Sequence, residues 1–131
     1  MVRQRYGGAA VRHPKAGNDF ATDADIAAEI AVRQMVTAAR PDDGFVGEEL
    51  GSTGSADRTW LIDPLCGTLN FAARTPLLAV NVALRVDQTI VVAASTDPMA
   101  GEIFWTDAHA GARAARRGGH AAHPIGTVRA G

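Results

Sequence analysis

The sequence contains a single cysteine, Cys66, and therefore no pair that could form a disulfide within the chain. It also lacks an unbroken apolar run of roughly 18 residues, the length needed for a membrane-spanning helix. The longest candidate, residues 77–95, is interrupted by Asn81, Arg85 and Asp87. The first 15 residues show no apolar signal core, and no internal repeat is visible. These absences predict a cytoplasmic chain in a reducing environment, with no membrane partner.

Acidic side chains are missing from both ends of the sequence. Residues 1–15 and residues 108–131 each carry a charge of +4, whereas the middle, which holds all 14 acids, carries −9. An acidic middle suits a cation site better than a nucleic-acid surface. The basic C-terminal end has no aromatic side chains and is only a weak signal for RNA or lipid, so we expect no nucleic-acid partner. With 131 residues and 47% apolar content, the chain suits one core-forming domain.

One long helix is predicted near the N-terminus. Thr22 and Asp25 have the spacing of an N-cap with an acid three residues later. The apolar spacing predicts a mostly buried helix over residues 23–40, ended by the Pro41-Asp-Asp-Gly turn. Its apolar arc comprises Ala27, Ala31, Val32, Met35 and Val36, and its narrow polar stripe comprises Glu29, Arg33 and Arg40.

Short β-rich runs follow the helix, at residues 45–46, 60–65, 77–86, 89–95 and 102–106. The two runs that meet at Asp87-Gln88 predict a hairpin, and the Gly/Ser-rich residues 51–56 predict a mobile loop. A helix followed by several strands predicts an α+β fold, with the long helix packed on an antiparallel sheet. We divide the chain into a basic segment (1–14), an α+β domain (15–112) and a basic Ala/Gly/Arg tail (113–131) that we expect to be poorly ordered.

Four acidic positions could carry chemistry: Asp25, the pair Glu48-Glu49, Asp63, and the pair Asp97 and Glu102. An acid in the first turn stabilises a helix, so Asp25 has a structural explanation. The last pair flanks a turn. Adjacent glutamates repel each other unless water or a cation compensates their charge. Asp63 ends an apolar run, and the proline after it predicts the end of that strand.

Residues 60–71, WLIDPLCGTLNF, bring a carboxylate, a thiol and a Gly-Thr pair together. A carboxylate at the end of a strand can bind a cation, and the free N–H groups at the start of a helix can bind a phosphate. Where the two adjoin, the cation and the phosphate lie next to each other. Cys66 is out of place there, because Mg²⁺ prefers oxygen ligands.

These stretches resemble the inositol monophosphatase family, the lithium-sensitive, magnesium-dependent phosphatases. The resemblance runs through Lys15 to Asp25, Gly47-Glu48-Glu49, residues 60–71, residues 76–84, and residues 97–112. Its specific signatures are Gly-Glu-Glu and Asp-Pro-x-Asp-Gly-Thr, in that order. The resemblance implies the N-terminal half of the inositol monophosphatase fold.

The resemblance also implies roles for individual residues. Glu48, Asp63 and the main-chain carbonyl of Leu65 would bind a first metal ion, Mg²⁺ or alternatively Mn²⁺. Thr68 would help Glu48 to orient the attacking water, and Asp25 would lie behind them, bonded to Thr68 or to a water on the metal. The implied reaction is hydrolysis of a small phosphate monoester, of the inositol or sugar phosphate type, by in-line attack of a metal-activated water.

Two departures from the family pattern weaken this implied activity. Cys66 stands where the signature has an aspartate that binds a second metal, and the second half of the family's chain is not matched. What the resemblance still implies is a phosphate site at the N–H groups of Gly67 and Thr68. We therefore expect an impaired phosphatase with at most one metal site. Because the unmatched half would leave apolar surface uncovered, we also expect a homo-oligomer, most simply a dimer.

Other interpretations of Cys66 and of the whole chain stay open. A cysteine-dependent phosphatase loop needs an arginine six residues after the thiol, where this chain has Ala72. A Cys–His hydrolase would gain a lowered thiol pKa from the helix start, but its base would have to come from the basic flanks, at His13, His109, His120 or His123. A lone cysteine is most often a small, inert residue. Beside a phosphatase, the chain could be a small-molecule-binding protein, an enzyme of a biosynthetic pathway that uses the same pocket, or a subunit that needs a partner.

Overall fold

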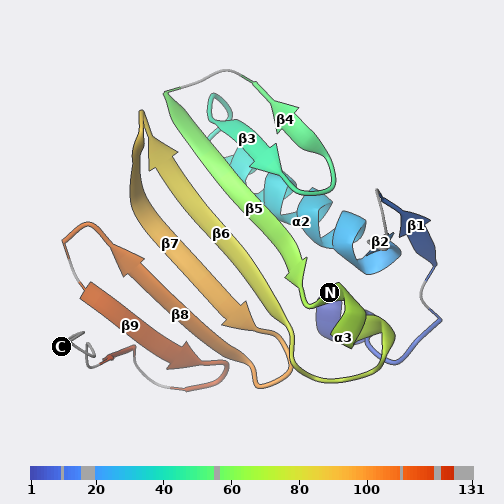
Figure 1. The fold of residues 1–131 in the computed structure, drawn as a ribbon. Coiled ribbons are helices and arrows are strands. Elements are labelled where there is room, and N and C mark those ends of the chain that lie inside the picture. Colours follow the sequence, from blue (N-terminus) through green and yellow to red (C-terminus); the bar gives the residue numbers. More distant parts are fainter. Residues whose placement is uncertain (10, 16–19, 55–56, 110, 120–121, 126–131) are drawn as a thin grey trace, which may run out of the picture.

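The computed structural model describes residues 1–9, 11–15, 20–54, 57–109, 111–119 and 122–125. Its elements, in chain order, are α1 (Val2–Arg5), β1 (Arg12–Pro14), β2 (Phe20–Thr22), α2 (Asp23–Ala39), β3 (Gly44–Gly47), β4 (Gly51–Thr53), β5 (Arg58–Cys66), α3 (Thr68–Ala72), β6 (Ala79–Val86), β7 (Thr89–Asp97), β8 (Glu102–Asp107), β9 (Gly111–Arg116) and β10 (His123–Pro124) (Figure 1).

A large mixed sheet forms the body of the molecule. Within the described residues, eight strands pair in the order β10-β9-β8-β7-β6-β5-β3-β4, while β1 and β2 pair with each other. The predicted α+β class, with a long helix packed on a sheet, is confirmed. The sheet is not purely antiparallel, because β3 and β5 run parallel. The chain makes β4 on the outer side of β3 and then returns as β5 on its inner side.

Helix α2 begins where the sequence predicts it, but it buries a different face. Thr22 and Asp25 form the predicted capping box. The buried residues are Ala24, Asp25, Ala28 and Glu29, whereas Met35 of the predicted apolar arc is 74% exposed. The expectation that Glu29 lies on a solvent-facing stripe is therefore wrong. Two alanines let the helix backbone approach the sheet closely, and the acids beside them are buried because they find hydrogen-bond donors there.

Strand β5 continues past Asp63, contrary to the prediction that Pro64 ends it. Asp63 pairs with Asn81 and Cys66 pairs with Ala79, so β5 contains one extra residue between these two pairs. Such a bulge suits proline, which has no N–H group to donate to the ladder. A bulge also redirects side chains, and here it lies between the candidate metal ligand Asp63 and Thr68.

The remaining strands form an antiparallel meander. β6 and β7 make the predicted hairpin, with Asp87 at a positive φ of 52° in its turn. β9 pairs with β8 and extends the sheet past residue 112, across the expected domain boundary. Gly51–Thr53, expected in a mobile loop, pairs with β3 as strand β4. Residues 55–56 of that loop, and residues 120–121 and 126–131 of the expected tail, lie outside the described part of the chain.

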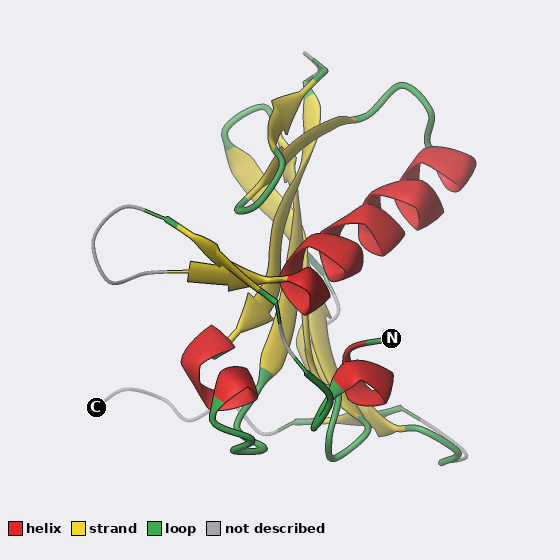
Figure 2. Ribbon diagram, turned by 90° about the vertical axis from the view of Figure 1, so that its right-hand side faces the viewer, coloured by secondary structure: helices red, strands yellow, loops and turns green. Residues whose placement is uncertain are grey.

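The hydrophobic core lies on one side of the sheet. In Figure 2 the long helix runs along one face of the sheet, which is seen nearly edge-on. The buried cluster comprises Val2, Ala24, Ala28, Leu65, Phe71 and Leu78, with Tyr6, Val80 and Met99 packed against it. Among the described residues, no helix has both the length and the apolar character that crossing a membrane requires.

Candidate active site

Glu48 and Asp63 come together because β3 and β5 are parallel neighbours. Gly47, the last residue of β3, pairs with Ile62 of β5. Glu48 directly follows Gly47, and Asp63 directly follows Ile62. The amide of Glu48 donates to the carbonyl of Ile62 at 3.2 Å, which fixes the end of β3 against β5. The carboxyl ends of parallel strands are a common place for ligand sites in sheets that contain them. The structure thus places the two predicted metal-binding residues at neighbouring positions of adjacent strands.

Asp63 has one carboxylate oxygen engaged and one without a partner. Its Oδ2 accepts a hydrogen bond from the Asn81 side chain at 3.2 Å. Its Oδ1 is buried and has no hydrogen-bond partner among the described residues. Our sequence analysis assigned no role to Asn81. The available signal was a polar side chain in the middle of an apolar β-run.

Lys15 is the cation that compensates the adjacent glutamates. Its Nζ lies 3.0 Å from Glu48 Oε1 and 2.7 Å from Glu49 Oε1. Burial alone would lower the pKa of Lys15, but the hydrogen bonds and charges of Glu49 and Glu48 outweigh it and raise this pKa. Burial, together with the charges of Asp25 and Glu48, raises the pKa of Glu49 although Lys15 acts to lower it. The sequence predicted that a compensating charge was needed, but we assigned no role to Lys15.

Thr68 is held in place from behind by Asp25, as the resemblance implied. Its Oγ1 lies 2.8 Å from Asp25 Oδ1 and 3.1 Å from the carbonyl oxygen of Leu65. The other oxygen of Asp25 accepts from the amide and hydroxyl of Thr22. Asp25 therefore both caps α2 and binds the Thr68 hydroxyl, while its role in a reaction stays a prediction.

Gly67 is required by the backbone at the turn into α3. Its φ is +101°, and a Cβ at this position would lie 2.7 Å from the carbonyl oxygen of Leu77. A larger residue would be strained and would displace this turn. Helix α3 has only five residues. The phosphate-binding role of Gly67 and Thr68 stays a prediction.

The environment of Cys66 does not activate its thiol. The side chain is exposed at the end of β5. Partial burial of the thiol raises the pKa of Cys66 above its ordinary value, and so do the charge of Asp63, a hydrogen bond with the Asp63 side chain and the charge of Glu48. The lowered thiol pKa that the Cys–His hydrolase alternative needs is therefore not found, because burial and the neighbouring carboxylates oppose the thiolate. A nucleophile needs the opposite shift.

The donor set suits one hard cation. Two carboxylates, Glu48 and Asp63, and the Leu65 carbonyl are oxygen donors of the kind that Mg²⁺ prefers. The buried, unpartnered Oδ1 of Asp63 is the observation that fits such an ion. In the part of the chain that is described, no three His, Cys, Asp or Glu side chains cluster closely enough to form a metal site by themselves. The second carboxylate site of the family signature is not rebuilt by any of these side chains.

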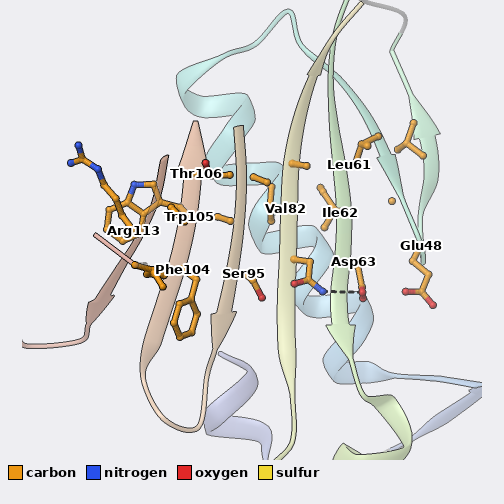
Figure 3. A pocket seen from close by; sticks show the side chains of 18 residues that line it. Glu48, Leu61, Ile62, Asp63, Val82, Ser95, Phe104, Trp105, Thr106 and Arg113 are labelled. Carbon is orange, nitrogen blue, oxygen red and sulfur yellow. Dashed lines mark hydrogen bonds between the residues drawn. The ribbon is translucent and has the colours of Figure 1, made fainter. Parts of the chain in front are cut away.

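A groove of about 710 Å³ runs across the sheet face that points away from α2. Its floor is apolar, with Leu61, Val82 and Ala94 among the lining residues. Figure 3 shows Glu48 and Asp63 at one end of this groove and Arg113 at the other. The candidate cation site therefore opens onto a long, mostly apolar surface.

Comparison with known proteins agrees with this geometry. The model of the inositol monophosphatase family matches residues 1–127. The chain belongs to the inositol monophosphatase family. It is 43% identical over 101 residues to inositol-1-monophosphatase of Caulobacter vibrioides, and 38% identical over 92 residues to histidinol-phosphatase of Chlorobaculum parvum. The solved structure of the extragenic suppressor protein SuhB from Bartonella henselae superposes with a TM-score of 0.84 at 30% identity.

The shared region is a minor part of each relative. The alignments cover 75% and 70% of this chain but only 40% and 36% of the Caulobacter and Chlorobaculum proteins. The SuhB superposition covers 88% of this chain and 47% of that structure. The chain thus spans less than half the length of these relatives, so their activities do not transfer to it without a test.

Proposed function

We propose that this chain binds one Mg²⁺ ion, or Mn²⁺ in its place, through Glu48, Asp63 and the Leu65 carbonyl, and hydrolyses a small phosphate monoester of the inositol or sugar phosphate type. The observation that carries the proposal is the buried, unpartnered Oδ1 of Asp63, in β5 next to the position where β3 ends and Glu48 follows. When bound, such an ion neutralises phosphate charge and lowers the pKa of a water molecule.

The protein's own groups support a water-mediated reaction. The hydroxyl proton of Thr68 is directed to Asp25 or to the Leu65 carbonyl, which leaves an Oγ1 lone pair free to accept a hydrogen bond from water. The side chain of Glu48 is 48% exposed, and its carboxylate can accept a hydrogen bond from the other hydrogen of that water. Together Thr68 and Glu48 would orient one water molecule toward a phosphate lying over Gly67 and Thr68.

Cys66 sets the expected level of activity. The residue that would complete a second cation site is a thiol whose pKa is raised, and a neutral thiol is a poor ligand for Mg²⁺. A pair of metal ions that stabilises both the attacking and the leaving oxygen is then not formed by these residues. For the 131 residues on their own, we expect slow turnover.

Phosphate release from a panel of inositol and sugar phosphates, with and without Mg²⁺, tests the proposal. Asp63→Asn should abolish the Mg²⁺-dependent part, because it removes the charge of the buried carboxylate. Glu102→Gln is the control, since it likewise converts a carboxylate to an amide, at a residue that pairs with Arg116 at 2.7 Å outside the site. Release that is independent of Mg²⁺, or equal in both variants, would contradict the proposal.

A second candidate function is a non-catalytic or biosynthetic role for the same pocket. Two relatives with different names have similar identity to this chain: 43% for the inositol-1-monophosphatase and 38% for the histidinol-phosphatase of Chlorobaculum parvum. The identities therefore do not favour one substrate class over another. Calorimetric binding of a phosphorylated metabolite without phosphate release would favour this alternative. The cytoplasmic location expected from the single cysteine stays a prediction.

We also propose that the chain associates with a second copy of itself. Val46, Phe104 and Ile125 line the groove on the open face of the sheet and are 39%, 40% and 37% exposed. Exposed apolar side chains along one apolar groove often mark an interaction site. A two-fold dimer is the commonest closed arrangement that would cover them.

A further inference from the structure

A fully buried acid in α2 holds the turn that carries Glu48. The side chain of Glu29 has no exposed surface. Its Oε2 accepts the amide of Glu49 at 2.8 Å and the amide of Leu50 at 3.3 Å. These amides follow Glu48 directly in the turn between β3 and β4. A buried carboxylate is tolerated only where donors satisfy it, and here the donors are the main chain of the site.

Arg33 completes this support, one helical turn after Glu29. Its Nη2 lies 2.7 Å from Glu29 Oε1, and its Nη1 donates to Thr53 Oγ1 at 2.7 Å. The guanidinium also lies over the ring of Phe45, with its Cζ 5.3 Å from the centroid. Arg33 therefore neutralises Glu29 and contacts both strands that flank the turn, β3 and β4.

The close contact with Glu29 also explains why position 47 is a glycine. A Cβ on Gly47 would lie 1.8 Å from Glu29 Oε1 and 2.3 Å from its Cδ. Any side chain here would push the carboxylate off the turn. The glycine of Gly-Glu-Glu is thus needed because the buried acid passes directly against the main chain.

Asp25 and Glu29 lie on the same face of α2, four residues apart. Asp25 holds Thr68, and Glu29 holds the turn after β3, so one rigid helix fixes both groups that would orient water. We propose that Glu29 is a positioning residue for Glu48, acting through the Glu49 and Leu50 amides. This inference rests on the proposed cation site, and it adds a residue that touches neither metal nor substrate.

The experiment measures Mn²⁺ affinity and amide hydrogen exchange on the same variants. Glu29→Gln introduces an NH₂ group where only donors face the side chain, so one contact, to Arg33 or to the turn, becomes repulsive. Gly47→Ala disturbs the same contact from the other side. Both should weaken Mn²⁺ binding about tenfold, the usual range for groups that orient a ligand, and should speed exchange of the Glu49 and Leu50 amides.

Two controls separate positioning from general destabilisation. Glu102→Gln breaks an ion pair of similar length outside the site, and Leu84→Ala weakens the core at a residue that is 6% exposed. Well below its unfolding temperature, each control should bind Mn²⁺ as the unaltered chain does. The Glu29→Gln/Gly47→Ala double variant should lose no more affinity than either single variant, because both changes break one contact.

Each outcome decides a different question. Unchanged Mn²⁺ affinity in folded Glu29→Gln and Gly47→Ala would overturn the positioning role. If the unaltered chain binds no Mn²⁺, the proposed cation site fails, and exchange at Glu49 and Leu50 still tests whether Glu29 holds the turn. Unchanged exchange in Glu29→Gln would show that it does not.

Discussion

Replacement of Asp25 should separate the stability of the fold from the chemistry of the site. Asp25 is 1% exposed, and its carboxylate accepts from three donors: the Thr22 amide, the Thr22 hydroxyl and the Thr68 hydroxyl. Alanine and asparagine remove these interactions to different extents. The structure therefore predicts a different loss of stability for each substitution.

Asp25→Ala should cost about 3 kcal/mol. It leaves the buried Thr22 amide without an acceptor, at about 1–3 kcal/mol. It also removes half of the capping box and a first-turn acid, at about 0.5–1 kcal/mol. Thr68 keeps an acceptor, because its hydroxyl can turn to the Leu65 carbonyl 3.1 Å away. At this chain length about 3 kcal/mol corresponds to a Tm roughly 10 °C lower.

Asp25→Asn should cost only about 1 kcal/mol, because the amide can satisfy every partner. Its oxygen can face Thr22, and its NH₂ group can donate to Thr68 Oγ1. The Thr68 proton then turns to the Leu65 carbonyl. That carbonyl is a proposed metal ligand, and the asparagine amide now occupies one of the two Thr68 lone pairs that could accept from water. Metal binding should therefore weaken several-fold although the fold is nearly intact.

Thermal unfolding and Mn²⁺ titration of both variants test this reasoning. Asp97→Asn is the matched control, because Asp97 also accepts two main-chain amides, from Met99 and Ala100, in a turn away from the site. It should leave Mn²⁺ affinity unchanged. Equal losses of Tm for Asp25→Asn and Asp25→Ala would refute the hydrogen-bond argument. Wild-type Mn²⁺ affinity in Asp25→Asn would refute the role of Thr68.

Four further predictions follow. Cys66→Asp should improve Mg²⁺ binding and raise phosphate release only slightly, and Cys66→Ala should change neither; loss of activity in the alanine variant would mean that the thiol does chemistry. Lys15→Met should tighten Mn²⁺ binding roughly two- to fivefold, because it removes an ammonium that competes with the ion for Glu48; this is the range for a partly exposed ion pair. Weaker binding in a titration would contradict this. Burial alone would raise the pKa of Asp43, but hydrogen bonds from Trp60 and Arg58 lower it. The ionised Asp43 carboxylate therefore stabilises the fold above about pH 4, and this stabilisation is lost as pH falls through the folded-state pKa. The Tm deficit of Asp43→Asn should accordingly be largest near neutral pH and shrink as pH falls below about 4. A deficit that does not vary with pH would exclude this ion pair as its cause. Light scattering should detect a dimer at micromolar concentration, and a stable monomer would refute the proposed self-association.

The elements that the sequence predicted correctly are those with local signals. The capping box at Thr22 fixes the start of α2, and the two-residue turn at Asp87 fixes the β6–β7 hairpin. Strands β4 and β9 were missed because their sequences, GST and GARAAR, carry no apolar alternation. Such segments become strands because a neighbouring strand offers its free hydrogen-bonding edge, and that neighbour is not visible from local composition.

The residues of the candidate site were also predicted only in part. The Gly-Glu-Glu and Asp-Pro signatures identified Glu48, Asp63 and Thr68, because a family pattern records positions that the fold brings together. The resemblance assigned no role to Lys15 or Asn81. Lys15 is separated from Glu48 by 33 residues in sequence, and Asn81 from Asp63 by 18. Contacts across such separations depend on strand register, which the sequence alone did not provide.

Glu29 was misplaced for a more general reason. Hydrophobic periodicity assigns charged residues to the solvent face of a helix. In α2 the sheet-facing side instead alternates alanines with acids, at positions 24, 25, 28 and 29. Alanine removes little surface from water, so this face cannot be explained by apolar burial alone. It is explained by the main-chain and side-chain donors that the acids meet at Thr22, Thr68 and the turn after Glu48. The buried face of such a helix is determined by the hydrogen-bond donors that its carboxylates meet, and these donors come from other parts of the chain. The feature visible in the sequence is the alanine beside each acid, because a short side chain lets the helix approach those donors closely.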